Sequence, residues 1–544
     1  MNPGTSELLN QSPPYEDIDL FAGDLPLQQA VAANGAAREN EGFAAFGRRW
    51  GSADMFEQGR LANDNPPRLV TFDARGRRRD AVEFHPAYHR LMEESIGAGL
   101  HAATWEASGT RAPAPAEVAR AARFYMAAQI ECGHLCPITM TRAALAALAA
   151  APAVLARLTP RVVERRYDRQ FRPWREKAGI TLGMGMTEKQ GGTDVALNTT
   201  HAEPAGDHYR ITGHKWFMSA PMCDGFLVLA QTAGGLTCFL MPRFRPDGSV
   251  NALRLLRLKD KLGNRSNASA EVEFDAAYAE RIGGEGRGVR TIIDMVQLTR
   301  LDCATASAGL MRMALAQALH HSRHRMVFGK RLVDQPMMRL VLADLALELE
   351  GALALVMRLA RSFDLAAQDP LEAARARVLT PAVKYLVCKT APAFISEAME
   401  CLGGNGYVEE NLLPRLFREA PVNAIWEGSG NVMGLDVLRA TTRDGEAVRA
   451  VIERLREETG DLPGGSEAAV DVGRMLAAEN AQAGARIATE RLARLATAAA
   501  LKATAPQRIA ESFAATRLAQ PRGAMFGAVA IDHPDAVLER VLAA

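Results

Sequence analysis

The sequence predicts a mainly α-helical protein with one central β-domain, and three observations support that prediction. A chain of 544 residues with 48% apolar content can form about three or four domain-sized cores. Apolar residues recur every three or four positions before residue 180 and again after residue 289, as in amphipathic helices. Between these blocks, short β-rich runs alternate with Gly, Asp and Asn turns. The order helices, sheet, helices lacks the βαβ alternation of a parallel α/β fold.

We expect five segments along the chain. Residues 1–45, rich in Pro, Asn and Gly, predict an extended arm with at most one short helix, and residues 46–180 predict a helical domain. Residues 181–286 predict the β-domain, through runs such as "HYRITGHKWFMSA" and "GFLVLAQT". Residues 287–456 predict a helical bundle, with helices at 290–322, 337–366, 372–403 and 431–456. The Gly-rich connector "GDLPGGSE" then precedes a C-terminal helical extension, 466–544.

Composition excludes several classes of protein. With 64 basic and 63 acidic residues, the whole chain has no field that would attract nucleic acid or a membrane, so such a partner needs a local patch. The longest apolar runs, such as "AALAALAAAPAVLARL", are shorter than a membrane-spanning helix, and we expect no membrane partner. No secretory signal pattern is visible, and seven scattered cysteines fit a reducing cytoplasm. Cys132 and Cys136 lie one helical turn apart without a second pair, which favours buried thiols over a metal site.

The stretch "GMGMTEKQGGTDV", residues 183–195, is the first candidate binding loop. Its glycines let the backbone turn tightly and approach a flat ligand. The hydroxyls of Thr187 and Thr193 can donate to carbonyl or phosphate oxygens. The loop is not a dinucleotide-binding G-x-G-x-x-G motif, because no parallel βα unit surrounds it. By spacing alone, a plain surface turn explains it equally well.

The second candidate stretch is "NAIWEGSGNVMGLDVLRA", residues 423–440. It places one carboxylate, Glu427, between Trp426 and a Gly/Ser loop that begins a helix, where free N–H groups suit a pyrophosphate. Partial burial against the indole would make Glu427 a better base. A helix-capping acid is the alternative, and it is the simpler reading of this stretch alone.

Two further stretches favour a binding site over plain turns and a helix-capping acid. In "SRHRMVFGKRLVDQP", Arg325 and Phe328 lie three residues apart near a predicted helix end. Their side chains suit a phosphate contact and an aromatic shelf. The glycines of "CLGGNGY", residues 401–407, allow another close approach of backbone to ligand.

Together and in this order, these stretches resemble the acyl-CoA dehydrogenase superfamily. Its T-E-x-x-x-G-S-D flavin loop is matched by residues 187–194, its R-x-x-F-G motif by 325–329, its G-G-x-G-Y motif by 403–407 and its E-G-T/S motif by 427–429. The chain is more closely similar to the AidB-like branch, the alkylation-response flavoproteins, through "GMGMTEKQGG", "GHKWFMS", "RLKDKLGNRSNAS" and "NAIWEGSGN". The resemblance covers nearly the whole chain. It implies an N-terminal helical domain, a β-barrel-like domain, a C-terminal four-helix bundle and an extra C-terminal helical segment.

The resemblance implies that FAD is the cofactor. It places the flavin against loop 184–193 and "KWFMSA", and it completes the pocket with loop 425–431. It assigns Arg325, Phe328 and "LGGNG" to the adenosine half of a neighbouring subunit's FAD, which predicts a homotetramer. The implied cofactor-binding residues are Met184, Gly185, Met186, Thr187, Gly191, Gly192, Thr193, Met218, Ser219, Ala220, Arg325, Phe328, Gly403, Gly404, Ile425, Trp426, Gly428, Ser429, Gly430 and Asn431.

Glu427 occupies the catalytic-base position of the family it resembles. There a carboxylate removes the α-proton of an acyl thioester while the β-hydrogen leaves as hydride to the flavin, and hydrogen bonds to the thioester carbonyl stabilise the enolate. The isovaleryl-type branch takes its base from an earlier helix, where this chain has Thr299 beside Arg300, so Glu427 is the only candidate. Phe217 replaces the usual tryptophan and Met433 the usual glutamine, which changes the groups that would line an acyl-CoA site.

AidB-like proteins are known as a group for poor acyl-CoA turnover and for binding double-stranded DNA, largely through the C-terminal segment. From residue 441 onward this chain has 13 Lys/Arg and 14 Asp/Glu, without the basic excess that phosphate binding favours. A solvated amphipathic helix is therefore the alternative to a DNA-binding face. Arg439 has two further readings, as a salt-bridge partner or as a cation near the flavin. The candidate DNA contacts are Arg439, Arg486, Arg491, Arg494, Lys502 and Arg508.

The sequence thus predicts a cytoplasmic FAD-binding flavoprotein of the AidB kind. It would bind double-stranded DNA, act in the response to DNA alkylation and retain weak, FAD-dependent acyl-CoA dehydrogenase activity. A metabolic acyl-CoA dehydrogenase for a short or branched acyl-CoA is the alternative. A flavin-bound scaffold with vestigial oxidation chemistry is a third hypothesis.

Overall fold

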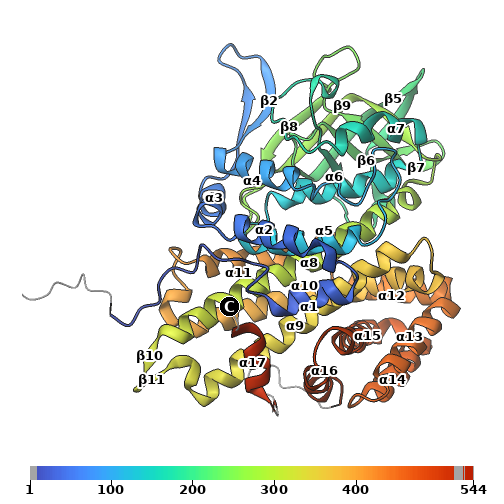
Figure 1. Cartoon of the computed structure of the whole chain (residues 1–544). Helices are drawn as coiled ribbons and strands as arrows, with labels where there is room; N and C mark the ends of the chain where they lie inside the picture. Colours follow the sequence, from blue (N-terminus) through green and yellow to red (C-terminus); the bar gives the residue numbers. More distant parts are fainter. Residues whose placement is uncertain (1–8, 520–530, 532, 543–544) are drawn as a thin grey trace, which may run out of the picture. The chain divides into compact units, whose positions relative to one another are not determined.

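The structure is a computed structural model that describes residues 9–519, 531 and 533–542 (Figure 1). The chain divides into two compact units. The first comprises Met1–Ala53, Glu117–Ile130 and Arg300–Ala544, and the second comprises Asp54–Ala116 and Glu131–Thr299. Residues 1–8 of the predicted arm, and residues 520–530, 532, 543 and 544 of the predicted extension, lie outside the described residues.

The second unit contains the predicted β-domain. Strand β5 pairs with β4 and β9, β9 pairs with β7, β7 with β6, and β6 with β4, so the pairing returns to its start and closes a barrel. Strand β3 pairs with β6 in parallel, and β8 pairs with β9 in antiparallel orientation. The β-barrel-like prediction is confirmed. The strands are β3 Leu182–Gly185, β4 His201–Ala205, β5 His208–Ser219, β6 Gly225–Thr232, β7 Gly235–Pro242, β8 Leu253–Leu258 and β9 Ser269–Ile282.

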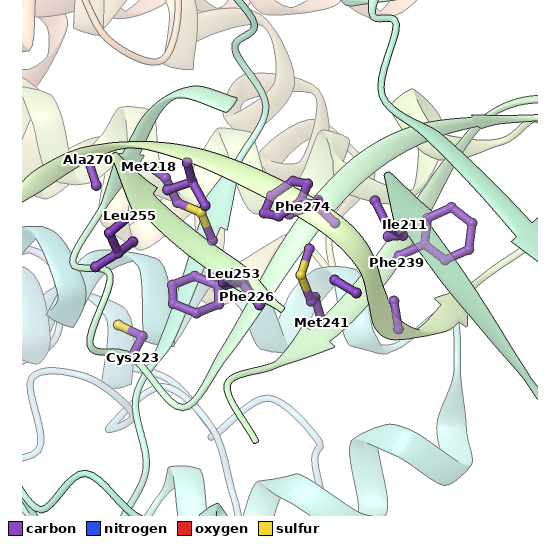
Figure 2. Packing of buried hydrophobic residues seen from close by; sticks show 14 of the residues in the cluster. Ile211, Met218, Cys223, Phe226, Phe239, Met241, Leu253, Leu255, Ala270 and Phe274 are labelled. Carbon is purple, nitrogen blue, oxygen red and sulfur yellow. The ribbon is translucent and has the colours of Figure 1, made fainter. Parts of the chain in front are cut away.

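Apolar side chains from these strands fill the barrel, as Figure 2 shows for Phe226, Phe239, Met241 and Phe274. Each such side chain stabilises the fold by about 1.5–3 kcal/mol when it is fully buried. In β6 every residue from Gly225 to Ala230 is buried, which explains why this strand reads as a continuous apolar run instead of an alternating one.

Apart from the start of α8, Gly288–His324, the α-helices of the second unit precede the barrel in the chain. They are most of α3 (Ala53–Asp64), together with α4 (Pro86–Gly97), α6 (Leu135–Leu148) and α7 (Pro152–Val162). A two-stranded hairpin, β1 Arg68–Phe72 with β2 Arg78–Glu83, lies between α3 and α4. The sequence did not predict this hairpin, because its strands are short and rich in charged residues instead of alternating cleanly.

The first unit is helical, and three long helices fall where the sequence predicts them: α8 Gly288–His324, of which residues from Arg300 onward belong to this unit, α9 Pro336–Leu365 and α10 Pro370–Cys401. Helices α9 and α10 pack together. The fourth predicted helix, 431–456, is two helices, α12 Gly430–Arg443 and α13 Gly445–Thr459. Asp444 separates them, because its backbone leaves the helical conformation (φ −148°) and its carboxylate accepts a hydrogen bond from the N–H of Ala447, 3.1 Å away.

Further helices complete the first unit on either side of this bundle. The predicted arm contains α1 (Leu25–Ala33) and the start of α2 (Asn40–Trp50), so it is more helical than expected. The unit also contains α5 (Ala116–Ile130) and α11 (Leu412–Asn423). The C-terminal segment forms α14 Gly465–Ala477, α15 Ala481–Thr504, α16 Gln507–Ala514 and α17 Pro534–Leu542. Helix α15 packs against α9, α10, α12 and α13. The C-terminal segment is therefore part of the bundle core and not an appended tail.

One helix among the described residues, α10, has the length and apolar composition of a membrane-spanning helix. The apolar runs are thus longer than the sequence suggested. However, 78% of the most apolar window of α10 is buried by the rest of the protein, as expected for the central helix of a bundle. All seven cysteines are free thiols, and six of them are buried.

Candidate functional site

The Gly-rich loop of the second unit begins where β3 ends and is shaped by a tight turn at residues 188–191. The N–H of Glu188 donates to the carbonyl of Gly191, and the N–H of Gly191 donates back to the carbonyl of Glu188. The carboxylate of Glu188 accepts hydrogen bonds from Lys215 Nζ (2.7 Å), Gln190 Nε2 (2.7 Å) and the N–H of Thr199 (2.7 Å). Glu188 therefore holds the loop in place and does not reach toward a ligand.

Glu188 and Lys215 form a buried ion pair, with both side chains fully buried. Burial raises the pKa of Glu188, but the hydrogen bond and charge of Lys215, together with donors at Thr199 and Thr200, outweigh burial and lower the pKa to about 2. Lys215 Nζ also donates to the carbonyl of Leu229 on β6, 2.8 Å away. This pair fixes the loop to the barrel wall.

The rest of the loop presents backbone and hydroxyl groups. Thr187 is half-buried, and its carbonyl accepts the N–H of Trp216 at 2.8 Å, whereas Gly192 and Thr193 are exposed. A Cβ at Gly192 would lie 2.9 Å from the Thr187 side chain, so only glycine leaves room for the Thr187 hydroxyl beside this backbone. Bare backbone beside two hydroxyls matches the donors that the polar edge of a flavin ring requires.

The strand end "KWFMSA" contributes little side-chain surface to a ligand. The side chain of Met218 is fully buried in the barrel core (Figure 2), so a contact with a ligand could come only from its backbone. Ala220 is buried with φ +50°, and its N–H donates to the carbonyl of Ala268. The Ser219 hydroxyl lies 3.0 Å from that of Ser269. Phe217, which replaces the family's tryptophan, is half exposed on the opposite side of the strand.

In the first unit, the backbone around Glu427 forms a sharp turn held by two buried cations. Glu427 has φ +57° and Gly428 has φ +102°. Arg300 Nε donates to the carbonyl of Glu427 at 3.0 Å. Lys384 Nζ, in the middle of α10, donates to the carbonyls of Trp426, 2.9 Å away, and Gly428. Three successive carbonyls are thus bound by Arg300 and Lys384.

This turn is strained, which points to a functional role. A non-glycine residue in the left-handed region costs about 1–3 kcal/mol and persists only where the surrounding structure fixes it. Here the fixing groups come from α8 and α10, which lie 127 and 42 residues away in sequence. The backbone that carries the half-buried Glu427 is therefore fixed by groups of two other helices.

A second layer of charges supports Arg300. Asp436 on α12 accepts hydrogen bonds from Arg300 Nη1 at 2.6 Å and Arg377 Nη2 at 2.8 Å. Burial raises the pKa of Asp436, but the two guanidinium groups outweigh burial and hold the pKa below its usual value. The sequence alone indicated a role for neither Lys384 nor Arg377. The position of Lys384 within the largely apolar stretch 378–388 was the only signal for it.

The start of α12 presents polar groups beside the Glu427 turn. Ser429, its N-cap residue, makes no side-chain capping bond and is exposed, and Ile425 is 66% exposed. Trp426 Nε1 donates to Asn423 Oδ1 at 3.1 Å. Arg486 of α15, one of the candidate DNA contacts, instead donates to Asn431 Oδ1 at 3.3 Å. The structure therefore places Arg486 beside the predicted cofactor loop.

The two motifs that the resemblance assigns to the adenosine half of FAD also lie in the first unit. Phe328 and Gly329 form the two-residue turn between β10 (Met326–Val327) and β11 (Lys330–Arg331), both with positive φ, and Phe328 is 95% exposed. The N-terminal arm contacts both motifs. Asn10 accepts a hydrogen bond from Arg325 Nη1 through its backbone carbonyl, 2.7 Å away, and Gln11 Oε1 accepts one from Asn405 Nδ2 at 3.2 Å. Gly403 (φ +60°) and Gly404 have open space where a Cβ would lie.

The remaining candidate DNA contacts divide into two groups. Arg491 pairs with Asp471 at 2.8 Å, Lys502 pairs with Asp461, and Arg494 pairs with Glu490 at 3.1 Å. Arg439 and Arg508 are exposed and form no ion pair with any described residue. The cations with spare capacity for a phosphate are therefore those of the second group.

The predicted site residues belong to two units: loop 184–193 lies in the second, and the Glu427 turn, the Arg325 motif and the Gly403 motif lie in the first. In the second unit, bare backbone beside hydroxyls suits the polar edge of a flavin. In the first unit, an exposed aromatic ring and an arginine suit a phosphate-linked nucleotide.

Comparison with known proteins identifies the family. Residues 10–169 match the model of the adaptive response protein AidB N-terminal domain, and residues 183–277 and 286–442 match the middle and C-terminal domains of acyl-CoA dehydrogenase. The chain is 52% identical to AidB of Escherichia coli (strain K12) over 441 residues, which cover 81% of each protein. The chain belongs to the AidB-like branch of the acyl-CoA dehydrogenase family.

A further relative of the acyl-CoA dehydrogenase family agrees with this assignment. The chain is 32% identical to acyl-CoA dehydrogenase family member 11 of Caenorhabditis elegans, over 82% of this chain and 74% of that protein. The crystal structure of ACDH-11 from C. elegans in complex with C11-CoA superposes with a TM-score of 0.86 at 28% identity, covering 99% of this chain and 97% of that one. Acyl-CoA dehydrogenases are FAD-dependent flavoproteins, so FAD is the cofactor of this AidB-like protein.

Proposed function

We propose that this AidB-like protein is an FAD-dependent oxidoreductase of acyl thioesters in which Glu427 is the catalytic base. The observation that carries the proposal is the Glu427 turn, where Arg300 and Lys384 bind three successive carbonyls around a residue with φ +57°. Strained backbone that persists at one glutamate indicates that this glutamate has a function.

Each group has a distinct role in the proposed reaction. FAD, when bound, supplies the hydride acceptor. Glu427 removes the α-proton of the acyl thioester, and the fixed backbone of its turn limits the positions that the carboxylate can reach. Loop 184–193 binds the flavin through Thr187 and Thr193, and the exposed N–H groups at the start of α12 bind the pyrophosphate. Met433, a buried residue of α12, stands where the family usually has a glutamine, which is consistent with weak turnover.

Reduction of the bound flavin by acyl-CoAs under anaerobic conditions tests this proposal. We expect a panel of straight and branched acyl-CoAs to bleach the flavin slowly, and Glu427→Gln to slow that bleaching by about 10²–10⁴-fold. Glu446→Gln, the same change in the first turn of α13, is the matched control and should have no effect. Equal rates in the wild type and Glu427→Gln would reject Glu427 as the base. Fast turnover would favour a metabolic dehydrogenase, and no bleaching would favour a flavin-bound scaffold.

We further propose that the protein is a homotetramer in which Phe328 of one subunit contacts the FAD of another. An aromatic side chain that is 95% exposed at the tip of a strained hairpin has no partner within its own chain among the described residues. Its exposure is explained if the ring packs against a ligand held by a second subunit. Sedimentation velocity should give a mass of about four chains, and a monomer with full FAD content would refute the sharing.

Binding of double-stranded DNA is a second proposed function, and the exposed arginines outside ion pairs support it. Arg439 and Arg508 are the best candidates, because Arg491, Arg494 and Lys502 already pair with acids and a phosphate would have to compete with them. Gel shifts of duplex DNA at two salt concentrations provide the test. Replacing both arginines by glutamine should lower the salt slope by about 0.9 per lost phosphate contact, whereas Arg454→Gln with Arg456→Gln should not.

We also propose a role in the cellular response to alkylated DNA, which the match of residues 10–169 to the adaptive response domain supports. Cells that express the protein in the cytoplasm should survive a methylating agent better than cells without it. If survival is unchanged and duplex DNA is not shifted even at low salt, the DNA role fails and the acyl thioester reaction alone remains.

A further inference from the structure

The hairpin that carries Phe328 at its tip is too small to keep one conformation by itself. Strands β10 and β11 have two residues each, so only two residue pairs join them. A two-stranded hairpin without further packing is at best marginally stable in water, even when its strands are longer. Contacts from elsewhere in the chain must therefore hold the hairpin in place.

Asn10 of the N-terminal arm supplies such contacts to β10. Its side chain binds both backbone groups of Met326, because Oδ1 accepts a hydrogen bond from the Met326 N–H at 2.7 Å and Nδ2 donates to the Met326 carbonyl at 2.9 Å. The backbone carbonyl of Asn10 also accepts a hydrogen bond from Arg325 Nη1 at 2.7 Å. One residue of the arm thus fixes two neighbouring residues of the hairpin and its arginine.

The backbone of Asn10 is strained where it makes these contacts. Its φ of +56° lies in the left-handed region, which is unfavourable for residues other than glycine, although asparagine tolerates it better than most. Asn10 is exposed, so burial does not impose this conformation. The hydrogen bonds to Arg325 and Met326 hold it instead, as expected where strained backbone serves a function.

The next residues of the arm are fastened to the same region. Gln11 Oε1 accepts a hydrogen bond from Asn405 Nδ2 at 3.2 Å, and Asn405 belongs to the Gly403 motif. The carbonyl of Pro13 accepts a hydrogen bond from His320 Nε2, 2.8 Å away, near the end of α8. The arm therefore joins both motifs that the resemblance assigns to the adenosine half of FAD.

The contact with Asn10 leaves Arg325 able to bind a ligand. A guanidinium group has five N–H donors, and the carbonyl of Asn10 is bound through Nη1 alone. Within the part of the chain that the structure describes, Nε and Nη2 of Arg325 donate to no acceptor, and Arg325 pairs with no acid. The arm therefore orients the arginine without occupying all of its donors.

We propose that Asn10 is a positioning residue for the cofactor, because it holds Arg325 and the Phe328 hairpin in the conformation that binds the adenosine half of a neighbouring subunit's FAD. This inference rests on the proposed contact between Phe328 and FAD. A hairpin that is ordered before the cofactor binds loses less conformational freedom on binding, so the contacts of Asn10 raise the affinity for FAD.

FAD release from the holoprotein, followed by flavin fluorescence after dilution, tests this role. Asn10→Gly removes the side-chain bonds to Met326 and tolerates the left-handed backbone. We expect it to weaken FAD binding about five- to tenfold, as for the loss of two hydrogen bonds, and to leave urea unfolding unchanged. Hydrogen exchange of the Leu332 amide, which donates to the Arg325 carbonyl at 2.7 Å, should accelerate because the hairpin loosens.

Asp17→Gly is the matched control in the same arm. Asp17 also has a positive φ, +55°, but its carboxylate accepts a hydrogen bond from the N–H of Ala53 and does not contact the hairpin. This variant should change neither FAD binding nor exchange at Leu332. Gln11→Ala, which removes only the bond to Asn405, is a second test variant and should weaken FAD binding about two- to threefold.

Comparison with Phe328→Ala separates this inference from the proposed FAD contact. If Phe328→Ala weakens FAD binding and Asn10→Gly does not, the positioning role is overturned while the contact of Phe328 with FAD stands. If neither variant weakens FAD binding, both proposals fail. Equal weakening by Asp17→Gly would show that the arm acts only through general stability, which also overturns the inference.

Discussion

Replacing Glu188 by glutamine should destabilise the protein far more than replacing an exposed glutamate. The Glu188 carboxylate accepts hydrogen bonds from Lys215 Nζ, Gln190 Nε2 and the N–H groups of Thr199 and Thr200. A glutamine keeps one acceptor oxygen but turns the other into an NH₂ donor that faces donors. It also leaves the fully buried Lys215 charge without its counter-charge.

The expected loss of unfolding free energy is about 3–5 kcal/mol, the range found when one partner of a buried ion pair is removed. Glu57→Gln is the matched control, because Glu57 pairs with Arg60 at 2.7 Å on the surface of α3 in the same unit. Exposed pairs contribute about 0–1 kcal/mol. The measurement is urea unfolding of the holoprotein for the wild type and both variants.

A local readout shows whether the loss arises at the loop. Hydrogen exchange of the Thr199 and Thr200 amides should accelerate in Glu188→Gln and stay unchanged in Glu57→Gln. A loss below about 1 kcal/mol in Glu188→Gln, or unchanged protection of those amides, would refute the reasoning that this ion pair holds the Gly-rich loop.

Three further predictions follow from other contacts. Gly309→Ala on α8 should lower the unfolding free energy by about 1–3 kcal/mol, because the added Cβ would lie 2.6 Å from the carbonyl of Tyr125. Gly473→Ala on α14 has open space around the added Cβ, so it should raise the unfolding free energy by about 0.5–1 kcal/mol in the same urea assay. Burial raises the pKa of Glu131, but hydrogen bonds from His134 and Asn63 outweigh burial and lower the pKa to about 2. The contribution of Glu131 to the unfolding free energy should therefore be complete above about pH 4.5 and fall as the pH decreases toward 2. Glu131→Gln should flatten this pH dependence of the unfolding free energy. Phe328→Ala should leave the unfolding free energy unchanged while weakening FAD binding in a fluorescence titration, and equal affinity would show that the ring does not contact FAD.

The functional motifs were readable in the sequence because each is a short, contiguous stretch. The Gly-rich loop, the Glu427 turn and the Arg325–Phe328 pair carry their identity within a few residues, and glycines and hydroxyls at fixed spacing specify the backbone that they need. The helix order and the β-domain were predicted in the same way, since periodicity is also a local property, whereas the barrel-like form came from the family resemblance.

The tertiary structure decided which distant groups hold those motifs. Lys384 and Arg300 bind the carbonyls around Glu427 from 42 and 127 residues away, and Arg375 meets Glu458 from 83 residues away. Likewise, sequence alone did not divide helix 431–456 at Asp444. A residue pattern records the face on which a side chain lies, but the partner of a buried charge is set by the packing of whole helices. The sequence therefore determined the chemistry available to this protein, and only the packed structure decided where each charge is used.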